Sequence, residues 1–353
     1  MDLEELRRRI DETDADLLRL LQRRAEIVQE IGRLKARTGH STFDPAREEL
    51  VLRRAGDAAE GPLTAAALRG IFAEIVSACR ALEGPVTVAY LGPAYTFTHL
   101  AALHRLGSQA EYVACASVSD VFDAVERGRA QVGVVPIENS LGGAVPETLD
   151  RFVTTDLNII GEHYEPIVQC LLANCELGEI KKLHTHPQAF VQCRHWLKEN
   201  LPAVEVINQS STAAAAQQAA SEPNSAALGP AEAAEPYGLQ VVAQAVQDFA
   251  DNRTRFFLLG RGPCSPTGRD KTSLLFSTRH RAGALHEAMT PFRIYGVNMT
   301  MIQSRPVPGR LWQYVFFVDI EGHVSDQPVA RALEDLRKMT SEVAVLGSYA
   351  AAD

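Results

Sequence analysis

Apolar positions near the start of the chain repeat at alternating steps of three and four, from residue 3 to residue 36. This heptad spacing predicts one long amphipathic helix, about 50 Å from end to end. A second helix is predicted from Asp44-Pro45, with Asp44 as its N-cap, and a third over residues 64–82. Because a single long helix cannot bury its own apolar stripe, the first helix must pack against other helices or against a partner chain.

A different pattern begins near residue 85, where short apolar runs alternate with amphipathic segments. The runs are PVTVAYLG, QVGVVPI, KKLHTH, AVEVIN, SAALG and a last one that follows a polar turn, with Thr254 at the junction. Strand, loop and helix alternate as expected for a mainly parallel sheet that is covered by helices on both faces. A break around residues 159–173 predicts two lobes that flank a cleft.

The last part of the chain follows a linker with the sequence GPCSPTGRD. Strands are predicted at TSLLFS, MTMIQS, LWQYVFFVDI and VAVLGSY, and helices over residues 283–295 and 328–339. This order of elements is typical of a ferredoxin-like α+β sandwich. We therefore expect a multidomain protein with an all-helical module over residues 1–84, a two-lobed α/β module over 85–262, and an α+β module with its linker over 263–353.

Composition narrows the class of protein. The 353 residues are 46% hydrophobic and 22% charged, which is typical of a soluble globular chain. A net charge of −9 argues against a general nucleic-acid binder. The six cysteines form no CxxC pair, and no run approaches the roughly 20 apolar residues of a membrane helix. With no apolar signal core at the start, we expect a cytoplasmic protein with reduced thiols.

Cations on the first helix are candidate ligands of an anion. Arg24 occupies a position of the apolar stripe, where an unpaired buried guanidinium is costly. Lys35 projects from nearly the same face, whereas Arg7 lies about 26 Å from Arg24 along the helix axis. Because one small ligand cannot reach all three, an antiparallel partner must supply its own Arg7, which predicts a dimer with shared sites. The alternative is a coiled-coil dimerisation domain whose charges are solvated.

The order LRRRID, LLQRRAEIVQEIGRLK, FDPAREE and IFAEIVSACRALE resembles the all-helical chorismate mutase family over the whole first module. The resemblance implies that the two carboxylates of chorismate are bound by Arg7 of the partner, Arg24 and Arg47. It implies that Lys35 and Glu83 address the ether oxygen, that Asp44 and Glu48 lie near the substrate hydroxyl, and that Cys79 stands where Ser is common. A pericyclic rearrangement needs positive charge and a fixed conformer but no cofactor.

Glu83 departs from the Gln that many relatives carry, and a carboxyl group can donate to an ether oxygen only when protonated. We therefore expect mutase activity to fall as the pH rises.

Hydroxyl and amide side chains follow several predicted strands of the second module, for example Thr96, Thr185 and Ser211. Loops at the carboxyl ends of parallel strands gather where ligands bind, and helix N-termini there suit carboxylates. The alternative is that each of these residues is merely a helix N-cap. His184, His186 and His195 lack the carboxylate or Cys spacing of a metal site, so no metal is expected.

The combination YLGPAYTFTH, VVPIENS, HTHPQAFVQC, SST and NRTRF resembles prephenate dehydratase. The resemblance implies that dehydration depends on Thr254, a neutral donor to the departing ring hydroxyl, and that prephenate is held by Thr96, Asn139, Ser140, Thr185 and Gln192. Alternation along the strand places Arg255 on the opposite face from Thr254, where a structural role is favoured. Glu138 either orients the loop or binds substrate. Tyr95, Gly142 and Pro230 depart from the family pattern.

The third module is similar to the ACT domain that confers phenylalanine feedback, on the residues DKTSLLFS, GAL, GVNMTMIQSRP and WQYVFFVD. The resemblance implies an L-phenylalanine site at Gly283, Ala284, Leu285, Asn298, Ser304 and Arg305, between two such domains. Gln303 and Ala282 depart from the common Glu and Pro. A plain dimerisation module is the alternative.

Together these resemblances imply a bifunctional enzyme of L-phenylalanine biosynthesis. It would convert chorismate to prephenate and prephenate to phenylpyruvate, without a cofactor, as a homodimer or higher homo-oligomer. One alternative is a mutase fused to an arogenate dehydratase. Another is a sensor that binds amino acids without catalysis.

Overall fold

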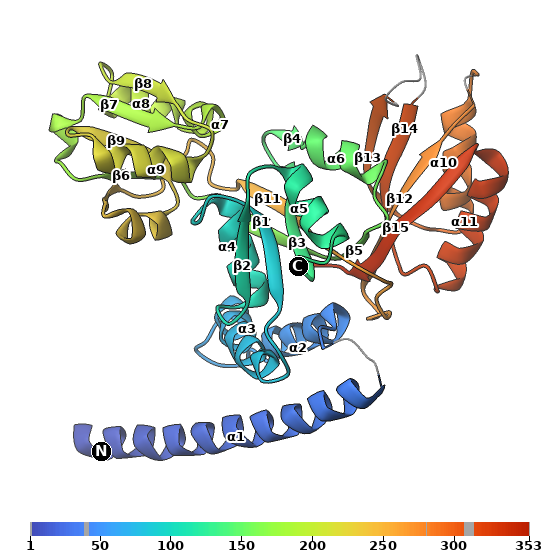
Figure 1. The fold of residues 1–353 in the computed structure, drawn as a ribbon, viewed down its shortest axis with the longest axis horizontal. Coiled ribbons are helices and arrows are strands. Elements are labelled where there is room, and N and C mark those ends of the chain that lie inside the picture. The colour runs from blue at the N-terminus through green and yellow to red at the C-terminus, as the bar shows by residue number, and fades with distance from the viewer. Residues whose placement is uncertain (1, 39–41, 280, 307–313, 353) are drawn as a thin grey trace. The chain divides into compact units, whose positions relative to one another are not determined.

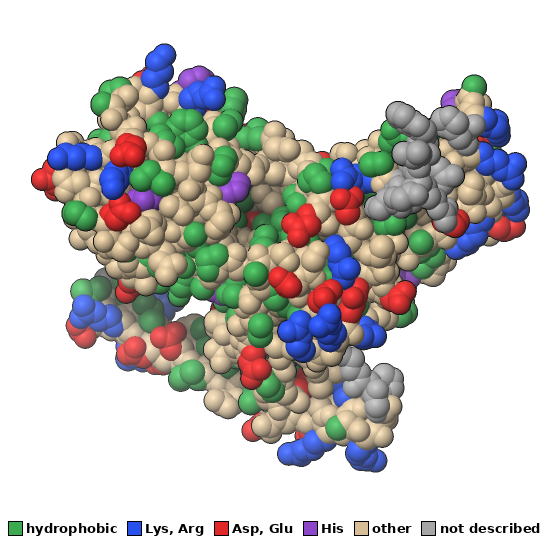
Figure 2. Space-filling model, turned by 45° about the horizontal axis from the view of Figure 1, so that its top comes forward, with side chains coloured by type: hydrophobic (Ala, Val, Ile, Leu, Met, Phe, Trp, Pro, Cys, Tyr) green, Lys and Arg blue, Asp and Glu red, His purple; other side chains and the backbone are tan. Residues whose placement is uncertain are grey.

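The computed structural model describes residues 2–38, 42–279, 281–306 and 314–352 (Figure 1). Contacts divide the chain into two compact units, one of residues 1–87 with 103–111, the other of residues 88–102 with 112–353. Every helix among the described residues is too short or too polar to cross a membrane. Acidic and basic side chains are interspersed over the face shown in Figure 2.

The first unit is helical, as predicted. Its helices are α1 (Leu3–Thr38), α2 (Pro45–Asp57) and α3 (Ala65–Ala81), together with the end of α4 (Phe97–Leu106). Asp44 caps α2 by accepting a hydrogen bond from the backbone N–H of Arg47 at 3.0 Å, and Thr64 caps α3 in the same way. These caps explain why the helices begin where the sequence predicts.

Helix α1 leaves its apolar stripe open. No residue of this described helix is buried, and Leu3 and Leu18 are 61% and 63% exposed. Isolated apolar side chains on a surface are ordinary, but a continuous stripe along 36 residues is not. Among the described residues, the stripe is left without cover over most of its length.

The second unit contains the two predicted lobes and the C-terminal module. In the first lobe the strands lie in the order β2 (Glu111–Cys115), β1 (Thr87–Leu91), β3 (Val132–Asn139), β11 (Arg253–Gly260) and β5 (Asn158–Pro166), with β4 (Gly143–Ala144) on β3. Helices α5 (Val118–Glu126) and α6 (Pro146–Phe152) pack on this sheet.

The second lobe has the strand order β10 (Gln240–Ala243), β6 (Cys170–Ala173), β9 (Ser225–Gly229), β7 (Lys182–Thr185) and β8 (Glu205–Asn208). Its helices are α7 (Pro187–Gln192), α8 (Arg194–Asn200) and α9 (Thr212–Ser221), with single 3₁₀ turns at Leu177–Glu179, Ala231–Ala233 and Glu235–Tyr237. The chain crosses between the lobes twice, and the crossing segments are joined by hydrogen bonds from Ile167 to Asn252 and from Val246 to Gln169.

The strand directions are mixed rather than mainly parallel. β1 and β3 are parallel, as are β7 and its neighbours β8 and β9. β11 is antiparallel to both β3 and β5, and β6 is antiparallel to β9 and β10. The physical reason is connectivity, because β5 leads out of the first lobe and β11 leads back into it.

The C-terminal sheet has the order β13 (Met299–Pro306), β14 (Tyr314–Glu321), β12 (Asp270–Ser277) and β15 (Glu342–Ala350), as the predicted strand–helix succession requires. Residues 311–313 of the third predicted strand lie outside the described residues. Helices α10 (Ala284–Ile294) and α11 (Gln327–Met339) cover one face of this sheet (Figure 1).

The opposite face of the C-terminal sheet packs on the first lobe. Leu275, Phe317 and Tyr349 from this face share one buried core with Phe152 and Phe257 of the lobe. β15 and β5 approach so closely that a Cβ atom at Gly347 would lie 2.1 Å from the carbonyl oxygen of Ile159. The C-terminal sheet is therefore an integral layer of the second unit.

Candidate functional site

Helices α1, α2 and α3 line a cavity of about 670 Å³ in the first unit. Seven of the eight residues predicted for the mutase site line it, namely Arg24, Lys35, Asp44, Arg47, Glu48, Cys79 and Glu83. The eighth, Arg7, is not among the lining residues and pairs with Glu4 at 2.9 Å on the exposed surface of α1. This separation is what the prediction of a partner's Arg7 requires.

The cavity contains a cation that the described residues do not neutralise. Nη1 of Arg24 is buried and has no hydrogen-bond partner among the described residues. Lys35 is already paired, since its Nζ donates to Oε2 of Glu83 and to the carbonyl oxygen of Thr42, both at 2.9 Å. The electrostatic bias of the site is therefore toward an anion that meets Arg24.

Arg80 is a cavity residue that the sequence analysis missed. It is 5% exposed, and its Nη1 donates to both carboxylate oxygens of Glu48 at 2.9 and 2.8 Å. Glu48 is thus held by Arg80, while the predicted ligand Arg47 remains exposed. The helical spacing of Phe72, Val76 and Arg80 could have indicated that Arg80 faces the bundle.

Thr254 lies at the start of β11, in the middle of the first-lobe sheet. Its register partners are Asn139 of β3 and Glu165 of β5. Nδ2 of Asn139 donates to Oγ1 of Thr254 at 2.9 Å. The described residues offer no acceptor to the hydroxyl hydrogen of Thr254, so this hydrogen can be donated to a ligand.

Asn139 and Ser140 organise the backbone around Thr254. Oδ1 of Asn139 accepts from the backbone N–H groups of Leu141 and Gly142 at 3.1 and 2.8 Å. Oγ of Ser140 accepts from the N–H of Arg253 at 3.0 Å. Both side chains therefore connect the loop after β3 to β11.

Glu165 was not singled out from the sequence, although it flanks Thr254 in register. Its side chain is 5% exposed, and Oε2 lies 2.9 Å from Nε2 of His163. Residues in register on adjacent strands share one face of the sheet. A buried carboxyl group thus lies next to Thr254. In the sequence, the alternation of the residues HYE along the strand could have indicated which face Glu165 occupies.

The predicted residues of the second lobe are buried near its carboxyl strand ends. Thr185 is fully buried and donates to the carbonyl oxygen of His186 at 3.2 Å. Oε1 of Gln192 accepts from Nε2 of Gln169 at 3.3 Å. No hydrogen bond among the described residues joins Thr185 or Gln192 to Thr254 directly.

Orphaned polar atoms lie on both segments that cross between the lobes. Oε1 of Gln169 and Nδ2 of Asn252 are buried and have no hydrogen-bond partner among the described residues. Neither residue was assigned a role from the sequence, although Asn252 begins the NRTRF motif. A buried polar group without a partner is costly, so a polar ligand at these segments would be stabilised.

Thr96 behaves as the N-cap alternative predicts. Its Oγ1 donates to the carbonyl oxygen of Leu91 at 3.0 Å and accepts from the N–H of His99 at 3.3 Å. The preceding residue, Tyr95, has a φ of 62°, and its N–H donates to Nδ1 of His99 at 3.0 Å. Burial lowers the pKa of His99, which keeps the ring neutral and able to accept.

The three histidines considered for a metal make separate contacts. Nδ1 of His184 lies 3.2 Å from Nε2 of Gln209, and Nδ1 of His186 accepts from the N–H of Gln188 as the N-cap of α7. His195 is exposed and lies 3.6 Å from Asp248. Burial lowers the pKa of His186, which suits an acceptor in a cap.

The residues predicted to bind an effector lie at α10 and β13. Gly283 has a φ of 80° directly before α10, and Leu285 is 37% exposed. Asn298 and Ser304 are also exposed. The guanidinium of Arg305 pairs with both carboxylate oxygens of Asp150 at 2.8 and 2.7 Å.

Family models match the chain in three consecutive segments. A model described as chorismate mutase type II matches residues 6–84, one described as prephenate dehydratase matches residues 88–264, and one described as ACT domain matches residues 272–338. A bifunctional chorismate mutase/prephenate dehydratase of Aquifex aeolicus (strain VF5) is 43% identical over 353 residues, which cover 99% of this chain and 98% of that protein.

Two solved structures resemble the second unit. A prephenate dehydratase from Arthrobacter aurescens in complex with L-Phe has a TM-score of 0.71 and 39% identity, and the match covers 76% of this chain and 91% of that one. GqqA, described as a novel type of quorum quenching acylase, has a TM-score of 0.70 and 31% identity, with 75% and 98% covered. Because such different descriptions share a fold, a function has to be argued from the site residues.

Proposed function

Because the chain belongs to the bifunctional chorismate mutase/prephenate dehydratase family, we propose that its helical cavity rearranges chorismate to prephenate and that the site at Thr254 converts prephenate to phenylpyruvate. In the second reaction prephenate loses carbon dioxide and its ring hydroxyl leaves as water. The observation that supports the pairing most directly is that one chain carries a buried guanidinium nitrogen without a hydrogen-bond partner among the described residues, Nη1 of Arg24, and an unused hydroxyl donor, at Thr254.

In the mutase cavity, Arg24 and Arg47 bind the carboxylates of chorismate, and the partner's Arg7 completes the clamp. Lys35 addresses the ether oxygen, where negative charge develops as the C–O bond breaks. Lys35 and Glu83 contact each other at 2.9 Å, so both reach the same point of the cavity. Asp44, Glu48 and Cys79 shape the remaining wall, and Arg80 fixes Glu48. The protein supplies position and charge, and no nucleophile is needed.

In the dehydratase site, Thr254 donates a hydrogen bond to the departing hydroxyl of prephenate, which takes up a proton from solvent and leaves as water. Asn139 donates to Oγ1 of Thr254 and thereby directs the remaining hydrogen of Thr254 toward the ligand. Aromatisation of the ring drives the reaction, so a neutral donor suffices where a strong acid is absent. Thr96, Ser140, Thr185 and Gln192 hold the substrate or the turns around it.

The assembly and the effector belong to the same proposal. Two chains pair through the exposed stripe of α1, and L-phenylalanine binds at Gly283–Leu285, Asn298 and Ser304 between C-terminal modules of two chains. The related dehydratase from Arthrobacter aurescens was solved in complex with L-Phe, which supports this choice of effector. Arg305 can join the effector site only if it leaves Asp150. A cytoplasmic location remains a prediction.

The test is to supply chorismate and to follow chorismate, prephenate and phenylpyruvate in the wild type, Arg24→Ala and Thr254→Ala. Arg24→Ala should lose prephenate formation and still convert added prephenate. Thr254→Ala should accumulate prephenate, with dehydration reduced by about 100-fold, whereas the matched variant Thr254→Ser keeps a hydroxyl and most of the rate.

Each alternative has its own outcome in this assay. A wild type that consumes neither chorismate nor prephenate but binds phenylalanine would support a sensor and overturn the proposal. Faster turnover of arogenate than of prephenate would support the arogenate alternative. Prephenate turnover that survives Thr254→Ala would remove Thr254 from the mechanism while leaving the reaction assigned.

A further inference from the structure

The residue after Thr254 carries the most extensive set of buried contacts around this site. Arg255 is 4% exposed and points to the opposite face of β11. Its Nε donates to Oε2 of Glu162 at 2.7 Å, and its Nη1 donates to Oδ2 of Asp319 at 2.5 Å. Glu162 belongs to β5 of the first lobe, whereas Asp319 belongs to β14 of the C-terminal sheet. One guanidinium therefore ties the strand of Thr254 to the C-terminal module.

The hydrogen bonds around Arg255 form a closed ring. Oγ of Ser273 donates to Oδ1 of Asp319 at 2.5 Å, so the hydroxyl of Tyr349 must donate to Ser273, 2.7 Å away. Nη2 of Arg255 donates to the same Tyr349 hydroxyl at 3.1 Å. Burial raises the pKa of Tyr349 well above its usual value, so the hydroxyl stays protonated and the ring stays closed.

Two of the buried ion pairs join the first lobe to the C-terminal sheet, namely Arg255–Asp319 and Lys271–Glu162. Lys271 of β12 donates to Oε1 of Glu162 at 2.9 Å, so two cations face two carboxylates. Glu162 and Asp319 have fully buried side chains. A buried charge that loses its partner is strongly unfavourable. Asp319 and Lys271 of the C-terminal sheet therefore have their counter-charges in the first lobe.

The position of Arg255 bears directly on Thr254 because the two residues are adjacent on β11. On the β3 side, the strand register shifts between Arg255 and Phe256, so the ladder is irregular beside Thr254. Such a bulge loosens the backbone restraint at that point and re-aims side chains. The side-chain network of Arg255 restores the restraint from the other face of the sheet.

The same network reaches the strand of the effector residues. Asp319 pairs in register with Met301 of β13, whose Sδ lies 3.6 Å from Nη1 of Arg255. Ser304 and Arg305 lie on the same strand. A shift of β13 relative to β14 would therefore displace Asp319 and, through their ion pair, Arg255.

From this geometry we propose that Arg255 is a positioning residue through which the C-terminal sheet, by way of Asp319 and Tyr349, sets Thr254 for dehydration. The inference rests on the proposed dehydratase function of Thr254. The C-terminal module is then part of the framework of the dehydratase site, and an effector that moves β13 and β14 acts on Thr254 through one side chain. Differential contacts of this kind are what coupling between two sites requires.

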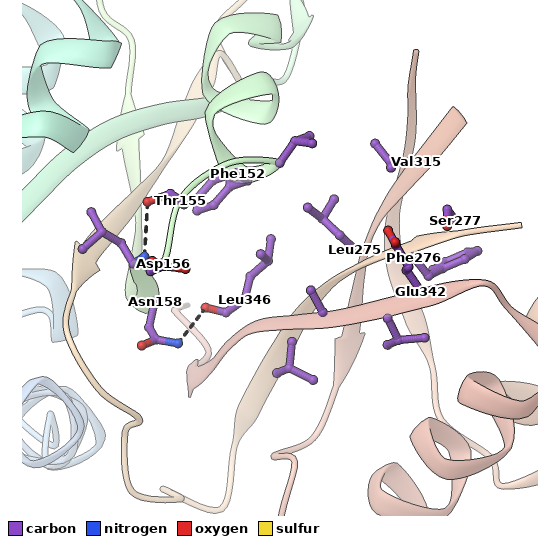
Figure 3. A pocket seen from close by; sticks show the side chains of 15 residues that line it. Phe152, Thr155, Asp156, Asn158, Leu275, Phe276, Ser277, Val315, Glu342 and Leu346 are labelled. Carbon is purple, nitrogen blue, oxygen red and sulfur yellow. Dashed lines mark hydrogen bonds between the residues drawn. The ribbon is translucent and has the colours of Figure 1, made fainter. Parts of the chain in front are cut away.

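The test uses the full chain with Asp319→Asn, which removes a charge from the ring far from the substrate, and Tyr349→Phe, which removes only a hydroxyl. Leu346→Ala is the matched control, because Leu346 lies at the same interface, beside Asn158 in Figure 3, and takes no part in the ring. Thr254 acts in the transition state, so Asp319→Asn should lower kcat for prephenate by at least about fivefold and change KM by less than about twofold. Tyr349→Phe should act in the same direction but more weakly.

Inhibition by L-phenylalanine is a further readout that a merely structural role would not move. Asp319→Asn and Tyr349→Phe should weaken inhibition, whereas Leu346→Ala should lower only the melting temperature. Wild-type kcat and inhibition in folded Tyr349→Phe and Asp319→Asn would overturn the inference while leaving the proposed function intact. A wild type without dehydratase activity would instead overturn the proposed function and this inference with it. Chorismate consumption by each chain verifies that the preparation is intact.

Discussion

Buried polar atoms without partners identify both candidate sites at the level of single residues. Nη1 of Arg24 is such an atom in the helical cavity, and Oε1 of Gln169 and Nδ2 of Asn252 are such atoms at the segments between the lobes. Leaving a buried polar group unsatisfied costs about 1–3 kcal/mol, more for a charge. A ligand that satisfies these atoms recovers that free energy as binding, which favours polar or anionic guests.

Glu83 gives the first prediction at this scale. The carboxyl group can donate to an ether oxygen only when protonated, whereas an amide donates at any pH. Because Glu83 pairs with Lys35 as a carboxylate, Glu83→Gln should supply the donor that the carboxylate lacks and raise mutase kcat/KM at neutral pH. Glu48→Gln is the matched control, because Glu48 lines the same cavity but is held by Arg80. An unchanged kcat/KM in Glu83→Gln would remove Glu83 from the mechanism.

Tyr95 gives the second prediction at the scale of single residues. Its φ of 62° is unfavourable for any residue except glycine, and its ring lies 6.1 Å from the ring of Tyr237 in the second lobe. Tyr95→Ala and Tyr95→Gly both lose this ring contact, but only alanine retains the backbone strain. The free energy of unfolding should therefore be about 1 kcal/mol higher for Tyr95→Gly than for Tyr95→Ala. Equal stability in denaturant titrations would contradict the strain argument.

The N-cap of α7 makes the stability of the second unit depend on pH. His186 caps α7 with Nδ1, and burial lowers its pKa, so the unfolded chain takes up a proton at a higher pH than the folded chain. The stabilisation is complete above the ordinary pKa of about 6.5 and is lost as the pH falls below it. His186→Asn keeps a capping acceptor that does not titrate.

The expected result is a smaller drop in melting temperature between about pH 7.5 and pH 5.5 in His186→Asn than in the wild type. His195→Asn is the control, because His195 is exposed and caps no helix in the described structure. An identical pH dependence in His186→Asn and the wild type would show that the cap does not titrate in this range.

The crossing of β15 over β5 gives a further prediction about elements. Gly347→Ala would place a Cβ atom 2.1 Å from the carbonyl oxygen of Ile159, so one of the two strands must move. We expect a loss of about 1–3 kcal/mol or more in the free energy of unfolding. Gly178→Ala is the matched control, because a Cβ atom there meets open space. Equal stabilities would show that the two strands separate without cost.

Element starts were predictable from the sequence because local chemistry determines them. Asp44 is the N-cap of α2, as its side chain predicts, and Thr64, the predicted start of the third helix, is the N-cap of α3. The antiparallel direction of β11 was not predictable from alternation, because it depends on where the chain returns from the second lobe. For the same reason, Glu165 was missed beside Thr254 and Arg80 beside Glu48, since their significance arises from contacts distant in sequence.

At the scale of the whole molecule, the apolar stripe of α1 and the cavity are the two features behind the proposed pairing of two chains. The stripe of α1 is exposed, with Leu17 and Leu20 at 53% and 57%, and Arg7 lies on the same helix away from the cavity. Closed dimers with twofold symmetry are the common solution for such a surface. In an antiparallel pair each Arg7 would reach the cavity of the other chain.

Shared sites can be tested by mixing two inactive chains. Arg7→Ala and Arg24→Ala should each lose mutase activity as homodimers, because every site then lacks one cation. Co-refolded at equal amounts, half of the dimers contain one chain of each kind, and one of their two sites carries both arginines. Mutase activity should therefore recover to about a quarter of the wild-type value. The control mixture of Arg24→Ala with Lys35→Ala should recover none, because both residues line the cavity of one chain. Equal activity of the two mixtures would place Arg7 outside the site.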